Sequence, residues 1–189
     1  MIKKYHVNNH EAINKDIIEK IKSYHTPNEF GFGFKDFDIF YDFDDLTSVH
    51  IIKGLFIENA LNFIGKDVDY KLDRGWIHTD WVGRNVEYIH NQTAKVGHFN
   101  LHRKSHDHVD KHLPEYLGVS CVYYLDSSHE QNGEAILQYE HEVKGLQNIK
   151  SKTGDMLIFP NELIHSASAT KSSEQNPRYS ISTNVRWLP

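Results

Sequence analysis

The stretch RYSISTNVRW, residues 178–187, alternates between two kinds of side chain along its whole length. One set of alternate positions, mostly apolar, holds Tyr179, Ile181, Thr183, Val185 and Trp187. The other set, entirely polar, holds Arg178, Ser180, Ser182, Asn184 and Arg186. Successive side chains of a β-strand point to opposite faces, so the pattern predicts a strand with one face in the core. A polar face that includes Arg and Ser suits the wall of a binding pocket.

Other short runs in the C-terminal half predict further strands. They are rich in β-branched and aromatic residues and bounded by Gly, Pro, Asp and Ser. The runs are HFNLHRK (98–104), GVSCVYYLD (118–126), GEAILQYE (133–140) and GDMLIFP (154–160). Several short strands at this spacing favour an antiparallel sandwich or barrel. We therefore expect a mostly β core in about residues 97–189.

The N-terminal half, about residues 1–96, is expected to supply flanking helices and substrate loops. Ile13, Ile17 and Ile21 recur at helical spacing, which predicts a helix within residues 8–31. Residues 54–64 are expected to be partly helical, and the aromatic stretch 30–45 predicts a loop that leads into a strand. No repeat, low-complexity tract or clear linker interrupts the chain, so residues 1–189 are predicted to form one domain.

Composition excludes several classes of protein. The 189 residues carry a net charge of −5 and are 39% hydrophobic, which favours a folded domain over a disordered chain. The chain contains no long run of Lys and Arg, and this absence argues against a nucleic-acid partner. The absence of an apolar leader or membrane-length segment leads us to expect a cytoplasmic protein without a membrane partner. The single cysteine, Cys121, lies in the apolar run SCVYYL and is predicted to be a buried, inert thiol.

The run HDHVDKH, residues 106–112, contains the first candidate metal ligands. His108 and Asp110 are two residues apart, so in an extended segment their side chains reach the same face. A third ligand is available in His165, which follows a predicted strand and turn in FPNELIHSAS. Two histidines and one carboxylate form the facial triad of non-haem Fe(II) oxygenases, which leaves one side of the metal open.

This kind of iron centre commonly takes 2-oxoglutarate as its electron source, and the distal carboxylate of that cosubstrate needs a partner. Arg178 presents a planar fork of donors that matches a carboxylate, and it lies thirteen residues after His165. Ser180 shares its face of the predicted strand and is available for a second hydrogen bond.

Residues 97–189 resemble the 2-oxoglutarate/Fe(II) dioxygenase superfamily, and most closely its prolyl-hydroxylase-like branch. The resemblance depends on the order and spacing of six short motifs, namely HVD, VYYL, GEAIL, GDMLIFP, LIH and RYSIS. It implies a double-stranded β-helix, or jelly roll. It also implies that His108, Asp110 and His165 bind Fe(II). Arg178 and Ser180 would then bind 2-oxoglutarate. Many relatives carry a tyrosine on the strand before the first ligand, where this chain offers Asn100 or His102.

The resemblance further implies an enzyme that uses O2 to hydroxylate an unactivated C–H bond of a small molecule or a peptide. The bond would belong to a prolyl residue of a peptide or protein, or to a free amino acid. Related halogenases have a small residue at the position of Asp110, so the aspartate favours hydroxylation. Ascorbate is an additional cofactor that the resemblance allows. The oligomeric state is open.

Other assignments remain open at this point. The run WIHTDW contains a second pair of this kind, His78 and Asp80, between two tryptophans that are expected in the core. His106 with His108 and His165 would form a three-histidine site of a cupin-type dioxygenase that does not use 2-oxoglutarate. Arg186 is a reserve carboxylate anchor on the face of Arg178. A non-catalytic jelly-roll binding module is a further alternative. Surface positions are expected for His112, His129 and His141, and a structural role for Glu134.

Overall fold

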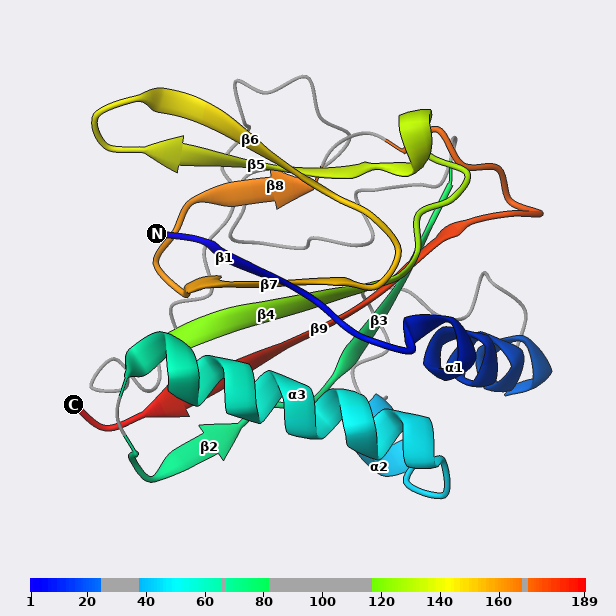
Figure 1. The fold of residues 1–189 in the computed structure, drawn as a ribbon, viewed down its shortest axis with the longest axis horizontal. Coiled ribbons are helices and arrows are strands. Elements are labelled where there is room, and N and C mark those ends of the chain that lie inside the picture. The colour runs from blue at the N-terminus through cyan, green and yellow to red at the C-terminus, as the bar shows by residue number, and fades with distance from the viewer. Residues whose placement is uncertain (25–37, 66, 82–116, 168–169) are drawn as a thin grey trace.

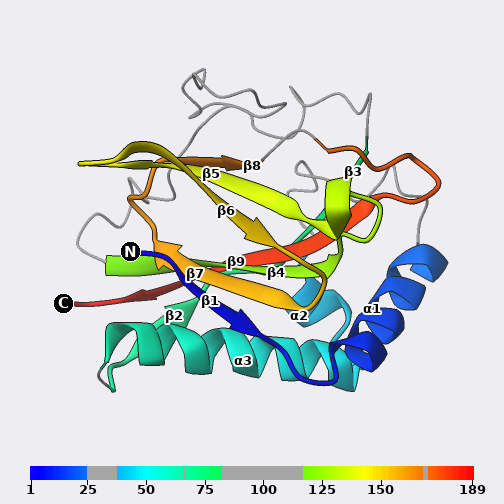
Figure 2. The same ribbon diagram turned by 45° about the horizontal axis from the view of Figure 1, so that its top comes forward.

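The computed structural model describes residues 1–24, 38–65, 67–81, 117–167 and 170–189. The strands in this part of the chain form two antiparallel sheets that face each other (Figures 1 and 2). The helices come from the N-terminal half and cover the outer face of the larger sheet. The predicted fold class, mostly β with flanking helices in a jelly roll, is confirmed.

The larger sheet has six strands in the order β1–β7–β4–β9–β2, with β3 also paired to β9. The strands are β1 (Lys3–His6), β2 (Tyr70–Leu72), β3 (Trp76–Asp80), β4 (Leu117–Asp126), β7 (Asp155–Pro160) and β9 (Arg178–Trp187). β4 pairs with nearly all of β9, while β2 and β3 pair with successive parts of the same strand. β9 is therefore a central strand, which agrees with its regular alternation in the sequence.

The smaller sheet has three described strands in the order β6–β5–β8. They are β5 (Ala135–His141), β6 (Gly145–Ser151) and β8 (His165–Ala167), and a short turn at Gln131–Gly133 connects β4 to β5. β5 and β6 form a hairpin, and β8 pairs with the other edge of β5. This sheet lies over the face of the larger sheet that the helices leave uncovered (Figure 2).

Three helices supply most of the core on the outer face of the larger sheet. They are α1 (His10–Tyr24), α2 (Ile39–Asp42) and α3 (Thr47–Ile64). Ile13, Ile17 and Ile21 are buried at the spacing that predicted α1. They belong to one cluster with residues of α2 and α3 and with the apolar side chains of β4, β7 and β9. A second, smaller cluster lies between the sheets and includes Tyr124, Ala135, Leu137, Leu157 and Phe159.

The strand predicted at the end of the aromatic stretch is wrong, because residues Ile39–Asp42 form the helix α2. Asp38 caps this helix, because its carboxylate accepts hydrogen bonds from the backbone N–H groups of Phe40, at 3.0 Å, and Gly75, at 2.8 Å. Ile39, Phe40 and Phe43 then become buried on the helical turn. Local capping therefore overrides the alternating pattern. Residues 30–37 of this stretch lie outside the described residues.

The N-terminal half also contributes β1, β2 and β3 to the larger sheet, which the sequence pattern did not predict. β1 and β2 have four and three residues, too few to establish a period of two. The helical segment predicted at 54–64 is confirmed and begins earlier, at Thr47.

Asn14 joins α1 to the larger sheet and offers a test of this packing. Its side-chain amide donates to Leu125 O at 2.8 Å, and Tyr123 Oη donates to Asn14 Oδ1 at 2.6 Å. Replacing Asn14 with alanine leaves both groups buried without this partner, so we expect a loss of about 1–3 kcal/mol in the free energy of unfolding. Urea denaturation measures the loss. Lys15→Ala, an exposed neighbour, should change stability by less than about 0.5 kcal/mol.

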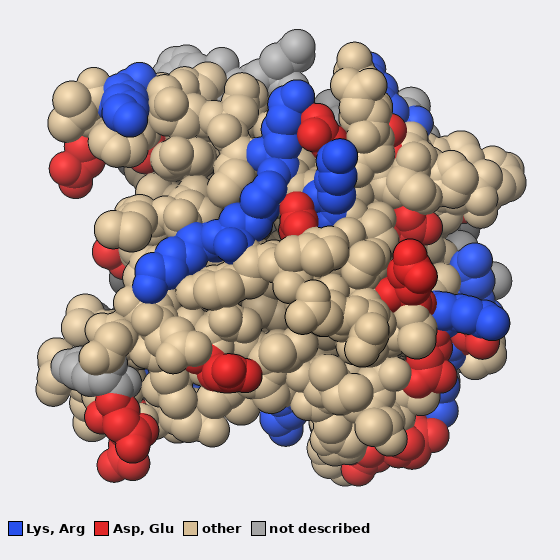
Figure 3. Space-filling model, in the orientation of Figure 1, with Lys and Arg blue, Asp and Glu red and all other residues tan. Residues whose placement is uncertain are grey.

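Basic side chains form a band across the face shown in Figure 3. Nearby acidic side chains neutralise some lysines of β1 and β6: Lys4 lies 3.5 Å from Asp155, and Lys150 lies 3.0 Å from Glu134. The structural role predicted for Glu134 is compatible with this ion pair and stays a prediction. Among the described helices, none has both the length and the apolar character needed to cross a membrane.

Candidate functional site

The polar face of β9 lies between the two sheets. Ser180 and Ser182 are directly opposite Tyr124 and Val122 of β4. Opposite residues of an antiparallel pair have their side chains on the same face. Tyr124 and Val122 pack in the inner cluster with Leu137 of the smaller sheet, so the two serines share that inner face. The polar face of β9, which was predicted to suit a pocket wall and includes Arg178 and Ser180, therefore lies at the interior of the jelly roll.

His165 enters the same interior from the smaller sheet. Its residue is 4% exposed, and its ring packs edge-on against Phe159 of β7, with 4.7 Å between centroids. Nδ1 lies 2.7 Å from Leu163 O. A carbonyl oxygen only accepts hydrogen bonds, so Nδ1 carries the proton and, in the neutral ring, Nε2 carries the lone pair. The short turn before β8 thus fixes both the ring and its tautomer.

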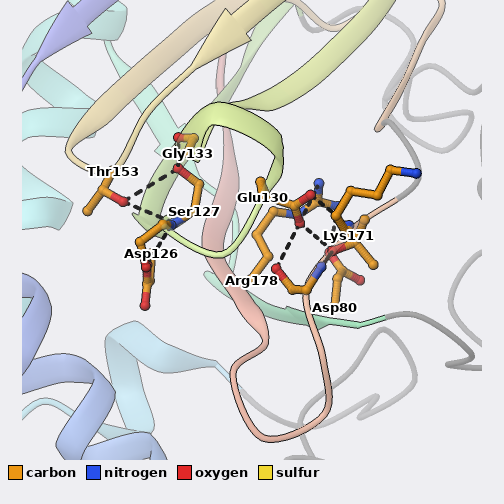
Figure 4. Close-up of polar contacts among 11 residues, drawn as sticks. Asp80, Asp126, Ser127, Glu130, Gly133, Thr153, Lys171 and Arg178 are labelled. Atoms are coloured by element: carbon orange, nitrogen blue, oxygen red, sulfur yellow. Dashed lines mark hydrogen bonds and ion pairs between the residues drawn. The ribbon is translucent and has the colours of Figure 1, made fainter.

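Arg178 lies at the start of β9 between two acidic side chains (Figure 4). Asp80 is its direct partner across the β3–β9 pair, and Nη2 donates to Asp80 Oδ2 at 3.1 Å. On the other side, Nη1 lies 3.6 Å from Glu130 Oε1. All three side chains are at most 4% exposed. The site therefore contains one buried cation and two buried carboxylates.

The carboxylate of Glu130 is held by the segment that precedes β9. It accepts hydrogen bonds from the hydroxyls of Thr170 and Ser172, the latter at 3.0 Å, and from the backbone N–H of Lys171 at 2.8 Å (Figure 4). These three donors, all from one short segment, hold both carboxylate oxygens in a fixed position. Glu130 thus acts as a fixed negative charge beside Arg178.

Opposing effects act on the pKa of Arg178. Burial alone would lower the pKa of the guanidinium, because it disfavours the charged form. The charges of Asp80 and Glu130, with a smaller contribution from Tyr124, exceed that effect, and the pKa is raised. Arg178 therefore stays a cation despite its burial.

His78 occupies the neighbouring position on the inner face. It is opposite Ser180 across the β3–β9 pair, and its Nε2 lies 2.5 Å from Ser182 Oγ. In the described part of the chain, no three side chains of His, Cys, Asp or Glu are close enough together to hold a metal ion. His78, Asp80 and His165 therefore do not form the rival three-ligand site, and Asp80 pairs with Arg178 instead.

Comparison with known proteins identifies the family. A family model described as the 2OG-Fe(II) oxygenase superfamily matches residues 91–186, which is slightly more than half of the 189 residues. The chain belongs to the 2OG-Fe(II) oxygenase superfamily. Among solved structures, it is similar to an oxidoreductase of the 2OG-Fe(II) oxygenase family from Burkholderia pseudomallei, with a TM-score of 0.43 and 14% identity. That match covers 66% of this chain and 48% of the other, so the chain spans about half the length of that relative. A search of curated protein sequences found no match.

Membership of the 2OG-Fe(II) oxygenase superfamily implies Fe(II) and 2-oxoglutarate, and the described residues fit both groups. Imidazole is a suitable iron ligand, and a metal-binding histidine typically donates its other ring N–H to a carbonyl or carboxylate, as Nδ1 of His165 does. Nη1 of Arg178 makes no hydrogen bond to any described residue, although it is buried and charged. A buried, charged donor that lacks a hydrogen-bond acceptor among the described residues suits a carboxylate ligand.

Several of the predicted site residues lie outside the described residues. These are Asn100, His102, His106, His108, Asp110 and His112. All of them fall within the range that matches the superfamily model. Their assignments remain predictions.

Other candidates have a described environment. Arg186, the reserve anchor, donates through Nε to Asp73 Oδ2 at 2.8 Å near the opposite end of β9. Cys121 is fully buried, and burial raises the pKa of its thiol, which confirms the prediction of an inert residue. Trp81 is buried, as expected for the core, and Trp76 is partly buried. His129 is exposed, as predicted, and His141 is partly exposed.

Sequence reasoning missed the two carboxylates around Arg178. Asp80 was considered only as a rival metal ligand, and Glu130 was not singled out, because it lies in the polar turn SSHEQNG that looks like any surface loop. Both carboxylates contact Arg178, and these contacts depend on strand register and loop packing. No spacing in the sequence signals them.

Proposed function

We propose that this chain is an Fe(II)- and 2-oxoglutarate-dependent dioxygenase that hydroxylates an unactivated C–H bond. One observation carries the proposal: His165, with its ring fixed by Leu163 O, and the buried cation Arg178 both face the interior between the sheets. A metal ligand and a carboxylate anchor on facing layers are the two parts that such a centre needs. Family membership supplies the identity of the cofactors.

In this proposal, His108, Asp110 and His165 bind Fe(II). The first two supply the His-x-Asp pair, and His165 supplies the distant third ligand of a facial triad. Together, Fe(II) and 2-oxoglutarate supply the oxidation, in which O2 converts C–H to C–OH while 2-oxoglutarate becomes succinate and CO2. The chain contributes orientation, through the Nδ1 hydrogen bond of His165, and an interior that keeps water away.

Arg178 anchors the distal carboxylate of 2-oxoglutarate in this proposal. Its charge is maintained in the interior, and its Nη1 has hydrogen-bonding capacity that the described residues do not use. Ser180, on the same face of β9, is the second donor. Asn100 and His102 are candidates for the role that a tyrosine plays in many relatives.

The proposed substrate is a prolyl residue of a peptide or protein, or a free amino acid. The support is the order of the motifs from HVD to RYSIS, which is that of the prolyl-hydroxylase-like branch. Asp110 at the carboxylate position favours hydroxylation over halogenation. Ascorbate would serve as a reductant that maintains Fe(II).

Anaerobic titration with Fe(II) and then 2-oxoglutarate tests the cofactor pair. We expect the weak visible charge-transfer band of the chelate in the wild type, its loss in Asp110→Ala, and a band that needs far more 2-oxoglutarate in Arg178→Lys, which keeps the charge but loses the planar fork. Arg186→Lys is the matched control on the same face of β9 and should behave as the wild type. Bound iron without any band would contradict the proposal and favour a cupin-type enzyme or a binding module.

Succinate formation tests the substrate class. With Fe(II), 2-oxoglutarate and O2 present, a proline-containing peptide or free proline should raise the rate of succinate formation above the rate without substrate. Mass spectrometry should then find a gain of one oxygen in the stimulating compound. If the band forms but neither compound is oxidised, the proline assignment is wrong and the cofactor assignment stands.

A further inference from the structure

We infer that Glu130 limits the affinity of the site for its cosubstrate, because its carboxylate competes with the distal carboxylate of 2-oxoglutarate for Nη1 of Arg178. The inference rests on the proposed function and deepens it. It assigns a role to a residue that is neither a metal ligand nor a cosubstrate donor.

The two carboxylates beside Arg178 differ in how they contact it. Asp80 accepts a hydrogen bond from Nη2 at 3.1 Å and belongs to the directly paired strand. Glu130 approaches Nη1 at 3.6 Å as an ion pair, and no hydrogen bond joins the two groups. Asp80 is therefore the constant partner of one side of the guanidinium. Glu130 places a negative charge near the other nitrogen, Nη1, but accepts no hydrogen bond from it.

Glu130 is also held from behind, so it does not depend on Arg178 for its position. The hydroxyls of Thr170 and Ser172 and the N–H of Lys171 donate to its two oxygens. These donors keep Glu130 in place when a ligand arrives at Arg178. A competing carboxylate therefore has to bind beside a negative charge that stays where it is.

The charges of these three side chains set the direction of the effect. Arg178 contributes one positive charge, and Asp80 and Glu130 contribute two negative charges, all nearly inaccessible to solvent. A distal carboxylate adds a further negative charge to a group that is already negative overall. Like-charge juxtaposition inside a desolvated site is costly. Glu130 thus lowers the affinity for a dicarboxylate, and a cosubstrate held less tightly makes turnover responsive to its concentration.

The test compares two ligands on the Fe(II)-loaded, anaerobic protein by calorimetry. One is 2-oxoglutarate, and the other is 2-oxopentanoate, which has the same five-carbon chain and the same chelating end but no distal carboxylate. In Glu130→Gln, we expect the Kd of 2-oxoglutarate to fall by at least about tenfold, because a like-charge juxtaposition in a desolvated site costs more than the free energy of a tenfold change in affinity. The Kd of 2-oxopentanoate should stay within about twofold of its wild-type value, because that ligand has no distal carboxylate to pair with Arg178.

Glu134→Gln is the matched control, since it changes the same residue type four positions along, at a surface ion pair with Lys150. It should leave both Kd values unchanged. A merely structural role for Glu130 would move both ligands together or weaken both. An unchanged or weaker affinity of Glu130→Gln for 2-oxoglutarate, or an equal gain for both ligands, overturns the inference.

The wild type gives a second reading that does not depend on the variant folding. When no other charge competes, removing one partner of a buried, hydrogen-bonded charge pair lowers affinity by about thirtyfold or more. With Glu130 in competition, we expect the two ligands to differ by less than about thirtyfold in the wild type, and a larger ratio overturns the inference. If the Fe(II)-loaded wild type binds neither ligand, the proposed function itself fails. If it binds both and Glu130→Gln shows no selective gain, only the role of Glu130 is wrong.

Discussion

Replacing His165 with alanine is expected to lower Fe(II) affinity by at least about 100-fold and to abolish 2-oxoglutarate turnover. Loss of a group that only supports a metal ligand already costs about 10- to 100-fold. In the proposed triad His165 is itself a ligand, so its loss should cost more. Fe(II) binding under anaerobic conditions and succinate formation in air measure the two effects. His129→Ala, at an exposed histidine, should change neither.

The effect of His165→Ala on folding needs separate control, because the ring packs on Phe159 in the interior. A comparison of urea denaturation without metal shows whether the variant still folds. His165→Gln retains much of the volume and should lose Fe(II) affinity while it remains folded. If the folded variant binds Fe(II) as the wild type does, His165 is not a metal ligand, and the site must be sought around other side chains.

The fold was predictable wherever an element was long enough to show its period. RYSISTNVRW predicted β9 with its bounds and the polarity of both faces, because ten alternating residues lie in the middle of a sheet. β4, β5 and β7 were found in the same way. β6 was missed because its sequence, GLQNIKS, is mostly polar and lies in a solvent-facing hairpin. α2 was wrong because capping by Asp38, a contact of single atoms, decided between helix and strand.

The sequence indicated which described side chains share the interior, but it did not indicate the charges around them. The order of motifs in the chain indicated His165, Arg178 and Ser180, and the structure places all three at the interior of the jelly roll. The contact of Arg178 with Asp80 depends on the register of β3 against β9, 98 residues apart in sequence. The contact with Glu130 depends on how the turn before β5 meets the segment before β9. Neither register nor loop packing is encoded in local spacing.

Replacing Arg178 with alanine is expected to lower the free energy of unfolding by about 3–5 kcal/mol, even without metal or cosubstrate. The side chain is 3% exposed and lies between two carboxylates that are equally buried. Removing the cation leaves both of them uncompensated, which is the costly way to break a buried ion pair. Urea denaturation of the metal-free protein measures the loss. Arg186→Ala is the control, and its loss should be smaller because Asp73, its partner, is 18% exposed and reaches water.

Neutralising the whole group should restore most of that stability. In the triple variant Arg178→Met, Asp80→Asn and Glu130→Gln, no buried charge remains uncompensated, which removes the main cost of breaking a buried ion pair. We expect it to recover more than half of the stability lost in Arg178→Ala. It should nevertheless fail to distinguish 2-oxoglutarate from 2-oxopentanoate, since the proposed anchor is absent. A triple variant no more stable than Arg178→Ala would show that the three side chains contribute through packing, and that the charge of Arg178 is not what holds this end of β9 in place.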